Sequence, residues 1–343
     1  MKNIPLPSED QYKMELMNKI EIFVKRMRWR AFYFDNESDP DERIQDTYGL
    51  KSANCPPPIK DLTEFEKELF DLVNKVKFRN VECKFQKEMQ SDLQRIKKSG
   101  DVFVAADKTS NIYKVKVDDY KRMLHGAVTK SYKKANDAIP EKVTKEGKSI
   151  ATEFKVLDKM NLNCKNECFI TLKDHKDNFI NNPTTRLINP SKNEIGRISK
   201  RVLEKLNSKL REETKVHQWK NTNEVIKWFN GLEQKSSGKF MVFDVKDFYP
   251  SITEELLELS LDFASKFVPI KSSDLKAIRH ARKWLLFRDS EPWVKRNNND
   301  FDVSMGAYDG AEVCELVGIF LLNTIAEDFN KNFIGLYRDD GLA

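Results

Sequence analysis

The hydrophobic residues of the first 100 positions recur every three or four residues, as they do on amphipathic helices. One such stripe begins at Met14. A second follows Thr63, which forms with Glu66 the T-x-x-E signature of a capped helix start. A third helical run ends before Gly100, a residue type that commonly terminates helices. The pattern predicts a mainly helical N-terminal extension over residues 1–100.

From residue 101 onward, short apolar runs alternate with helical periodicity. The apolar runs predict two strand pairs, at 102–106 with 112–117 and at 168–172 with 186–188. A four-residue run at 240–243 predicts a buried strand, and 333–337 predicts another. Helices are expected at 118–160, 195–210, 253–267, 272–287 and 310–329. This mixture of elements predicts an α+β fold.

The composition narrows the classes of protein. Of the 343 residues, 39% are hydrophobic, and 60 Lys and Arg stand against 54 Asp and Glu, for a net charge of +6. No apolar run approaches the ~20 residues of a membrane span, and no secretory signal is present, which predicts an intracellular protein, nuclear or cytoplasmic. The five cysteines are scattered, and Cys164 and Cys168 have no second pair nearby, so we expect reduced thiols and no zinc site.

Aspartates directly follow two of the predicted strands. Asp244 follows the 240–243 run, and Asp339 and Asp340 follow the 333–337 run, just before Gly341, which permits a tight turn. Adjacent carboxylates repel each other unless a cation lies between them. If Asp244 met the Asp339–Asp340 pair, the oxygen-rich site would suit two Mg²⁺ ions about 4 Å apart for phosphoryl transfer. A lone Asp-Asp pair after a strand is usually only a turn, but the second aspartate motif favours the metal site.

Residues 243–252, FDVKDFYPSI, and the box Tyr337-Arg338-Asp339-Asp340 resemble the first palm motif and the YxDD box of reverse transcriptases, most closely those of Penelope-like retroelements. The resemblance implies right-hand polymerase fingers and a partial palm over residues 101–343. It also implies RNA-directed DNA synthesis from dNTPs, with an RNA template and a DNA primer. Two Mg²⁺ ions, or Mn²⁺ as the alternative, would be held by Asp244, the Val245 carbonyl, Asp339 and, more peripherally, Asp340.

The same resemblance implies nucleotide contacts near the first motif. Tyr249 takes the position of a steric gate, whose bulky ring excludes a 2′-hydroxyl and so selects deoxynucleotides. Asp247 and Phe248 precede it and are expected beside the same nucleotide. The alternative for Tyr249 is an ordinary core aromatic before a proline turn.

A second set of matches lies upstream. Lys173 and Arg186 stand in a stretch similar to the fingers motif of these enzymes, although Leu172 and Leu187 replace the prolines of the family form. A Lys and an Arg on one hairpin can clamp a triphosphate; a solvated basic hairpin is the alternative. Ala106-Asp107-Lys108 resembles the A-D-K stretch that opens the Penelope-like fingers, with a simple turn as the other interpretation.

Template and primer contacts are the least specific predictions. Met305 and Gly306 match the M-G of a palm box, but Ala307 and Tyr308 depart from the S-P that follows in the family. Between residues 186 and 220, ten Lys and Arg stand against four Glu, an excess equal to that of the whole chain. We expect Arg197, Arg201 and Lys205 to share one helix face that follows a phosphate backbone, unless that face is merely solvated.

The chain ends at Ala343, three residues past Asp340, so the return strand of the palm hairpin, the primer grip and the thumb are expected to be missing. This favours a second hypothesis, a non-catalytic nucleic-acid-binding remnant of such an element. A third class, telomerase-like or viral RNA-templated RNA polymerases, shares the two-metal carboxylates, but Tyr249 argues against an RNA product. A two-metal nuclease would not predict the Lys173–Arg186 hairpin. The oligomeric state is left open.

Overall fold

A computed structural model of the chain describes residues 8–35, 48–50, 56–79, 84–136, 138–162, 165–233, 235, 238–296, 300–304, 306–328 and 330–343. They divide into two units. The first draws its described residues from 1–47, 52–104 and 112–120, and the second from 48–51, 105–111 and 121–343. No helix in the described part of the chain is both long and apolar enough to cross a membrane.

The first unit is mainly helical. It holds α1 (Glu9–Asp35), η1 (Lys60–Leu62), α3 (Thr63–Lys75), α4 (Lys84–Ser99) and most of the hairpin of β1 (Val102–Ala105) and β2 (Ile112–Val115). Helices α1 and α3 pack together, and Arg28 Nε donates to Glu66 Oε1 at 2.6 Å. The predicted capping box is therefore wrong. Glu66 is taken by Arg28, and the Thr63 hydroxyl donates instead to the Ile59 carbonyl at 3.2 Å.

The second unit is built around a four-stranded sheet in the order β6-β10-β11-β7. Strand β6 (His217–Gln218) runs parallel to β10 (Gly335–Tyr337), whereas β11 (Asp340–Leu342) is antiparallel to both β10 and β7 (Val242–Asp244). The expectation of a missing return strand is therefore wrong. Asp340–Leu342 itself is the return strand, and it lies between two neighbours instead of at an open edge.

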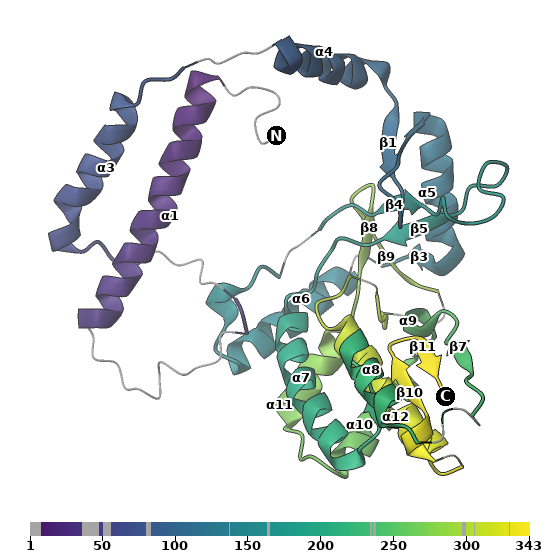
Figure 1. Ribbon diagram of the computed structural model, residues 1–343. Helices are drawn as coiled ribbons and strands as arrows, with labels where there is room; N and C mark the ends of the chain where they lie inside the picture. The colour runs from purple at the N-terminus through teal and green to yellow at the C-terminus, as the bar shows by residue number, and fades with distance from the viewer. Residues whose placement is uncertain are drawn as a thin grey trace. The chain divides into compact units, whose positions relative to one another are not determined.

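Helices cover this sheet and supply the core. Helix α12 (Gly310–Ile325) contacts β6 and β10, and both α7 (Ile195–Thr214) and α10 (Glu254–Ser265) pack against α12 (Figure 1). Among the described residues, the unit also holds α5 (Val117–Ser131, which begins in the first unit), α6 (Ala138–Glu153), α8 (Thr222–Gly231), the short α9 (Phe248–Ser251) and α11 (Ser272–His280). It also includes the 3-10 turns η2 (Leu157–Lys159) and η4 (Lys331–Phe333). Apolar residues of α7, α10 and α12 form the main buried cluster, as their periodicity predicts.

Two smaller sheets complete the unit. Strands β4 (Phe169–Leu172) and β5 (Thr185–Ile188) form the predicted hairpin. Strands β3 (Tyr132–Lys134), β9 (Glu291–Lys295) and β8 (Leu286–Arg288) form a sheet that interrupts two of the helices expected from the sequence. Their apolar residues, such as Tyr132, Leu286 and Trp293, pack into one buried cluster, and short apolar runs of this kind suit either type of element.

The strand predicted at 240–243 is present in part but is not buried. Phe240, Met241 and Val242 are 46%, 59% and 80% exposed. Strand β7 is the last in the order of its sheet, so these side chains gain no cover from a further strand on that side. The apolar run alone could not distinguish an edge strand from a central one.

Candidate nucleotidyl-transfer site

The carboxylates predicted to act together meet on adjacent strands. Asp340 is the direct cross-strand partner of Asp244, so both side chains leave the same face of the sheet. The Val245 amide donates to the Asp339 carbonyl at 2.8 Å, which ties the hairpin turn to the end of β7. The structure thus places Asp340, expected to be peripheral, opposite Asp244, and Asp339 in the turn before it.

The turn between β10 and β11 has two residues, Arg338 and Asp339, closed by the pairing of Tyr337 with Asp340. Arg338 has φ of +57°, a left-handed conformation that costs a non-glycine residue free energy. Its guanidinium lies 5.6 Å from the centre of the Tyr337 ring, a cation–π contact that offsets part of this cost. The strained turn brings two successive carboxylates to one end of the sheet.

Gly341 decides whether β11 can lie beside β7. It pairs with Phe243, whose ring occupies the space that a Cβ at position 341 would need. The glycine therefore lets the aromatic ring cover the strand while the backbone ladder stays intact. This explains the Asp-Asp-Gly sequence better than turn flexibility does, because Gly341 lies within β11 and not in the turn.

Mg²⁺ prefers oxygen ligands, and the donors at this hairpin are carboxylate oxygens and the Val245 carbonyl. Asp244 and Asp340 are exposed and Asp339 is half-buried, so an ion could reach them from solvent. Among the residues that the structure describes, no three His, Cys, Asp or Glu side chains converge closely enough to hold one ion. The residues fit a divalent cation as an opposed carboxylate pair, with a third carboxylate one position away along the chain.

The residues after Asp244 form a short helical turn. Asp247 has φ of +52° and precedes α9, in which Phe248 is buried and Tyr249 is half-buried. The Tyr249 hydroxyl is hydrogen-bonded to the Cys314 thiol. Burial raises the pKa of Tyr249 to about 12, and the negative charge of Asp339 adds to this shift.

Helix α12 leaves room for the same ring at its N-terminus. A Cβ at Gly310 would lie 3.5 Å from Tyr249 Cε1 and 3.1 Å from the Ser304 carbonyl, so a side chain there would press on both. Tyr249 also packs at the edge of the main core. Tyr249 thus belongs in part to the core, and its role as a steric gate stays a prediction.

Lys173 and Arg186 lie on a separate hairpin. Arg186 pairs with Thr171 across β4 and β5, and the Lys173 amide donates to the Thr184 carbonyl at 2.9 Å. Arg186 Nη1 lies 2.8 Å from Asp107 Oδ1, and the side chains are 31% and 6% exposed respectively. The hairpin thus presents one partly exposed guanidinium whose position is set by a buried carboxylate.

The A-D-K stretch is more than a turn, because it docks on this hairpin. Ala106 bridges to Leu172, and the Asp107 amide donates to the Leu172 carbonyl at 2.8 Å. The loop also holds Asp174, whose Oδ2 accepts from Thr109 Oγ1 at 2.5 Å and from Asn111 Nδ2 at 2.9 Å. Asp107 was not among the residues predicted to be functional, and the signal that could have found it is its place in the A-D-K motif.

The predicted template and primer residues do not share one environment. The Arg197 guanidinium lies 4.3 Å from the centre of the Tyr308 ring, and its Nη2 donates to the Tyr308 hydroxyl at 3.0 Å. Arg201 and Lys205 are exposed farther along α7, and Gly306, with φ of +104°, is exposed beyond β9. Met305 lies outside the described residues.

A buried ion pair fixes the start of α12. Arg282 and Asp309, whose side chains are 0% and 1% exposed, are hydrogen-bonded to each other. Arg282 Nε and Nη1 and Asp309 Oδ2 have no other partner among the described residues. Asp309 directly precedes α12, so this pair ties the loop after Gly306 to the C-terminal end of α11.

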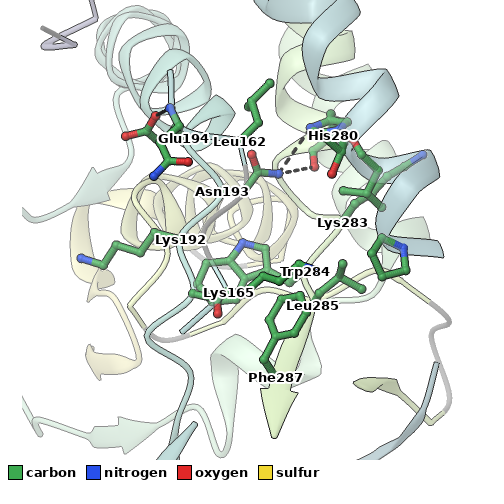
Figure 2. A pocket seen from close by; sticks show the side chains of 15 residues that line it. Leu162, Lys165, Lys192, Asn193, Glu194, His280, Lys283, Trp284, Leu285 and Phe287 are labelled. Carbon is green, nitrogen blue, oxygen red and sulfur yellow. Dashed lines mark hydrogen bonds between the residues drawn. The ribbon is translucent and has the colours of Figure 1, made fainter. Parts of the chain in front are cut away.

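A pocket of about 70 Å³ lies near the start of α7 and the end of α11 (Figure 2). His280 is held there between the Val143 carbonyl at 2.9 Å and Asn193 Nδ2 at 3.3 Å, and burial lowers the pKa of His280. Lys283, in the same lining, pairs with Glu146 at 2.6 Å. None of the predicted site residues is among the described residues that line it, so the pocket is a place where helices and loops pack through paired polar groups.

Comparison with known proteins gives limited information. No protein-family model matches the chain, and no curated protein matches it in sequence. Solved structures similar to it include apo telomerase from Candida tropicalis truncated from the C-terminal domain (12% identity, TM-score 0.46, 85% of this chain and 62% of that one). Telomerase from Candida albicans in complex with a TWJ fragment of telomeric RNA (11%, TM-score 0.46, 86% and 54%) and apo telomerase from Candida tropicalis (11%, TM-score 0.47, 95% and 55%) are similar to the same degree.

The chain thus spans between 54% and 62% of the length of these structures. At 11–12% identity and TM-scores below 0.5 the likeness is loose.

Proposed function

We propose that this chain is the fingers and palm part of an RNA-directed DNA polymerase of the Penelope-like retroelement type. The observation that carries the proposal is the direct opposition of Asp244 and Asp340, with Asp339 in the turn before Asp340. Two aspartates 96 residues apart in sequence are brought together on adjacent strands, an arrangement that metal-assisted phosphoryl transfer uses.

In this proposal the primer 3′-oxygen attacks the α-phosphorus of a dNTP. The new P–O bond forms as the bond to pyrophosphate breaks, and the proton of the 3′-hydroxyl passes to solvent water. Two Mg²⁺ ions, when bound, would lower the pKa of that hydroxyl and neutralise the leaving pyrophosphate. Asp244, Asp340, Asp339 and the Val245 carbonyl are the groups of this chain that would hold them.

The remaining residues position the nucleotide. Arg186, held by Asp107, would contact the triphosphate, and Lys173 on the same hairpin would add a second positive charge. Tyr249 is held between Cys314 and the N-terminus of α12, so its ring has little freedom to move aside for a 2′-hydroxyl. Asp247 and Phe248 set the position of that ring by forming the start of α9. Arg197, Arg201, Lys205, Met305 and Gly306 would contact the template and primer.

Primer extension on an RNA template with a DNA primer, dNTPs and Mg²⁺ tests this proposal. Asp244→Asn and Asp340→Asn are expected to lower incorporation by at least about 100-fold, because each removes a charge that stabilises the transition state by several kcal/mol. Asp328→Asn, an exposed aspartate after α12, is the matched control and should retain activity. Equal incorporation by wild type and both carboxylate variants would overturn the proposal.

The second candidate is a nucleic-acid-binding protein that does not polymerise. The observation that favours it is that no three carboxylates converge on one point within the described ranges. It predicts that wild type binds a primer–template duplex in a gel-shift assay without extending it, in Mg²⁺ or in Mn²⁺. Incorporation above that of the Asp244→Asn variant would exclude it.

A further inference from the structure

A groove of about 350 Å³ runs beside α7, between the middle of that helix and the loop that joins α10 to α11. Four basic side chains line it, from Arg201, Lys205, Lys209 and Lys271. The only carboxylate among its described lining residues is that of Asp274. Positive charge thus predominates around a hollow large enough for an extended ligand, even with Arg201 paired to Glu204 at 3.1 Å.

The helical period places three of these cations in a row. Arg201, Lys205 and Lys209 are four residues apart, so each lies about 6 Å farther along the α7 axis on one side of the helix. Arg197, one turn earlier, is instead stacked on Tyr308. The basic row that looked continuous in the sequence therefore divides, and its later part faces the groove.

The fourth cation comes from the opposite wall. Lys271 is the residue before α11, where its charge adds to the positive end of the helix dipole. Asp274, in the first turn of α11, is half-buried, and burial raises the pKa of its carboxyl while Lys271 and Lys205 oppose that shift. Both walls are therefore positive, and the single carboxylate is flanked by cations on either side.

The groove also has an aromatic wall. Tyr48 has φ of +52° and is anchored by Leu50, which is 6% exposed in the cluster of Ile195 and Ile198. The Tyr48 ring packs edge-on against Phe154 with centroids 5.8 Å apart, and it is only half-buried. Val202 and Leu206 provide apolar surface beside it. Proteins that bind single strands combine a basic groove with aromatic faces on which bases stack.

We propose that this groove binds a segment of single-stranded RNA, with phosphates along the Arg201–Lys205–Lys209 row and Lys271, and a base against Tyr48. The choice of RNA over an acidic peptide rests on the proposed function, in which RNA is the template. Arg201 and Lys205, proposed above as template and primer contacts, line the groove, whereas none of the site carboxylates and neither Lys173 nor Arg186 does. The groove would therefore hold a part of the template RNA that lies away from the carboxylates.

Binding of a fluorescein-labelled single-stranded RNA 20-mer, measured by anisotropy, tests the proposal. Lys209→Glu/Lys271→Glu is expected to weaken binding at least 10-fold and to reduce the slope of log K against log salt by about 1.4, because two phosphate contacts are lost. Lys220→Glu/Lys227→Glu makes the same charge change on exposed lysines at and before α8 and should change affinity less than 3-fold. Equal weakening by both double variants would overturn the proposal.

Asp274→Asn removes the one carboxylate among the described lining residues and should tighten RNA binding about 3-fold. A variant that merely disturbed the structure of the groove would not tighten binding. Unchanged or weaker binding would count against the groove. Competition with polyglutamate distinguishes RNA from an acidic peptide as the occupant. If polyglutamate displaces the labelled RNA as efficiently as unlabelled RNA does, the choice of RNA is overturned.

The same measurements separate this proposal from the proposed function. Asp339→Asn should leave RNA affinity unchanged while abolishing incorporation. If the wild-type chain binds RNA through the groove but does not extend a primer, the polymerase function is overturned and the groove proposal stands.

If Lys209→Glu/Lys271→Glu fails to fold, as read by circular dichroism, Lys209→Gln/Lys271→Gln serves instead. Its expected loss of RNA affinity is about 5-fold, and a loss of less than 2-fold would overturn the proposal.

Discussion

Arg186 Nη1 lies 2.8 Å from Asp107 Oδ1, and this contact joins two motifs that are 79 residues apart in the chain. Asp107 is 6% exposed, and its Oδ2, like Arg186 Nε, has no further partner among the described residues. The ion pair therefore holds the guanidinium at one point, and the exposed 31% of the Arg186 side chain is the part that could meet a triphosphate. Asp107 acts as a positioning residue for Arg186 under the proposed function.

Replacing Asp107 by Asn should raise the KM for dNTP about 10-fold and leave kcat within about 3-fold, because a charged hydrogen bond is replaced by a neutral one worth about 1.4 kcal/mol less. Steady-state primer extension over a range of dNTP concentrations measures both constants. Asp101→Asn, which removes the charge that pairs with Lys114 in the first unit, is the control and should change neither. A lower KM in Asp107→Asn would mean that Asp107 restrains Arg186 and does not position it.

Gly341→Ala should destabilise the second unit by about 1–3 kcal/mol, since the new methyl group would overlap the Phe243 ring. Phe243→Ala in the same chain should recover part of the loss and give a coupling free energy of at least about 1 kcal/mol. Urea unfolding followed by tryptophan fluorescence measures this. Gly126→Ala is the control, because no atom would lie within 4 Å of its Cβ. Additive effects of Gly341→Ala and Phe243→Ala would contradict the packing described here.

Arg282→Met should cost about 3–5 kcal/mol, because it leaves the Asp309 carboxylate buried without a counter-charge. Arg282→Met/Asp309→Leu should recover most of that loss, since a well-packed apolar pair can replace a buried ion pair. The comparison is Arg279→Met, three residues earlier, whose pair with Glu258 is 49% and 32% exposed and should contribute less than about 1 kcal/mol. A double variant no more stable than Arg282→Met would show that the pair is not replaceable.

The Cys314 thiol should be unreactive in the folded chain. Burial raises the pKa of Cys314 to about 12, above its ordinary value of 9, so little thiolate forms at pH 8.5. We expect iodoacetamide to modify Cys314 only in urea, as read by peptide mass mapping. Rapid alkylation of the native chain at this residue would contradict the buried Cys314–Tyr249 contact.

The same shift predicts the response of stability to alkaline pH. Because the pKa of Cys314 is raised in the folded state, the thiol of the unfolded state loses its proton at a lower pH. The contribution of Cys314 to the free energy of unfolding is therefore complete below about pH 9 and is lost as the pH rises toward 12. The slope is about 1.4 kcal/mol per pH unit for one group. Cys314→Ala should reduce the fall in unfolding free energy between pH 9 and 11. Part of the fall should persist because the pKa of Cys168 is also raised, to about 11.

Much of the local structure followed from the sequence. The helical periods of 195–210 and 253–267 predicted α7 and α10, and the apolar runs around residues 170 and 187 predicted the β4–β5 hairpin. Where the prediction failed, the competing partner was distant in sequence. Glu66 pairs with Arg28 and does not cap its own helix, and the helix expected at 118–160 is broken by β3, which pairs with β9.

The sequence by itself determined that aspartates directly follow two strands, because an apolar run followed by an aspartate is a local feature of the chain. Only the tertiary structure decided that Asp340 lies opposite Asp244 and that Asp340–Leu342 is a paired return strand. Likewise, only folding brought Asp107 to Arg186 and turned Arg197 toward Tyr308, away from the row that lines the groove. The physical reason is common to these cases: strand register and ion pairing depend on which distant segments share a sheet or a buried surface, and the local pattern of residues does not contain that information.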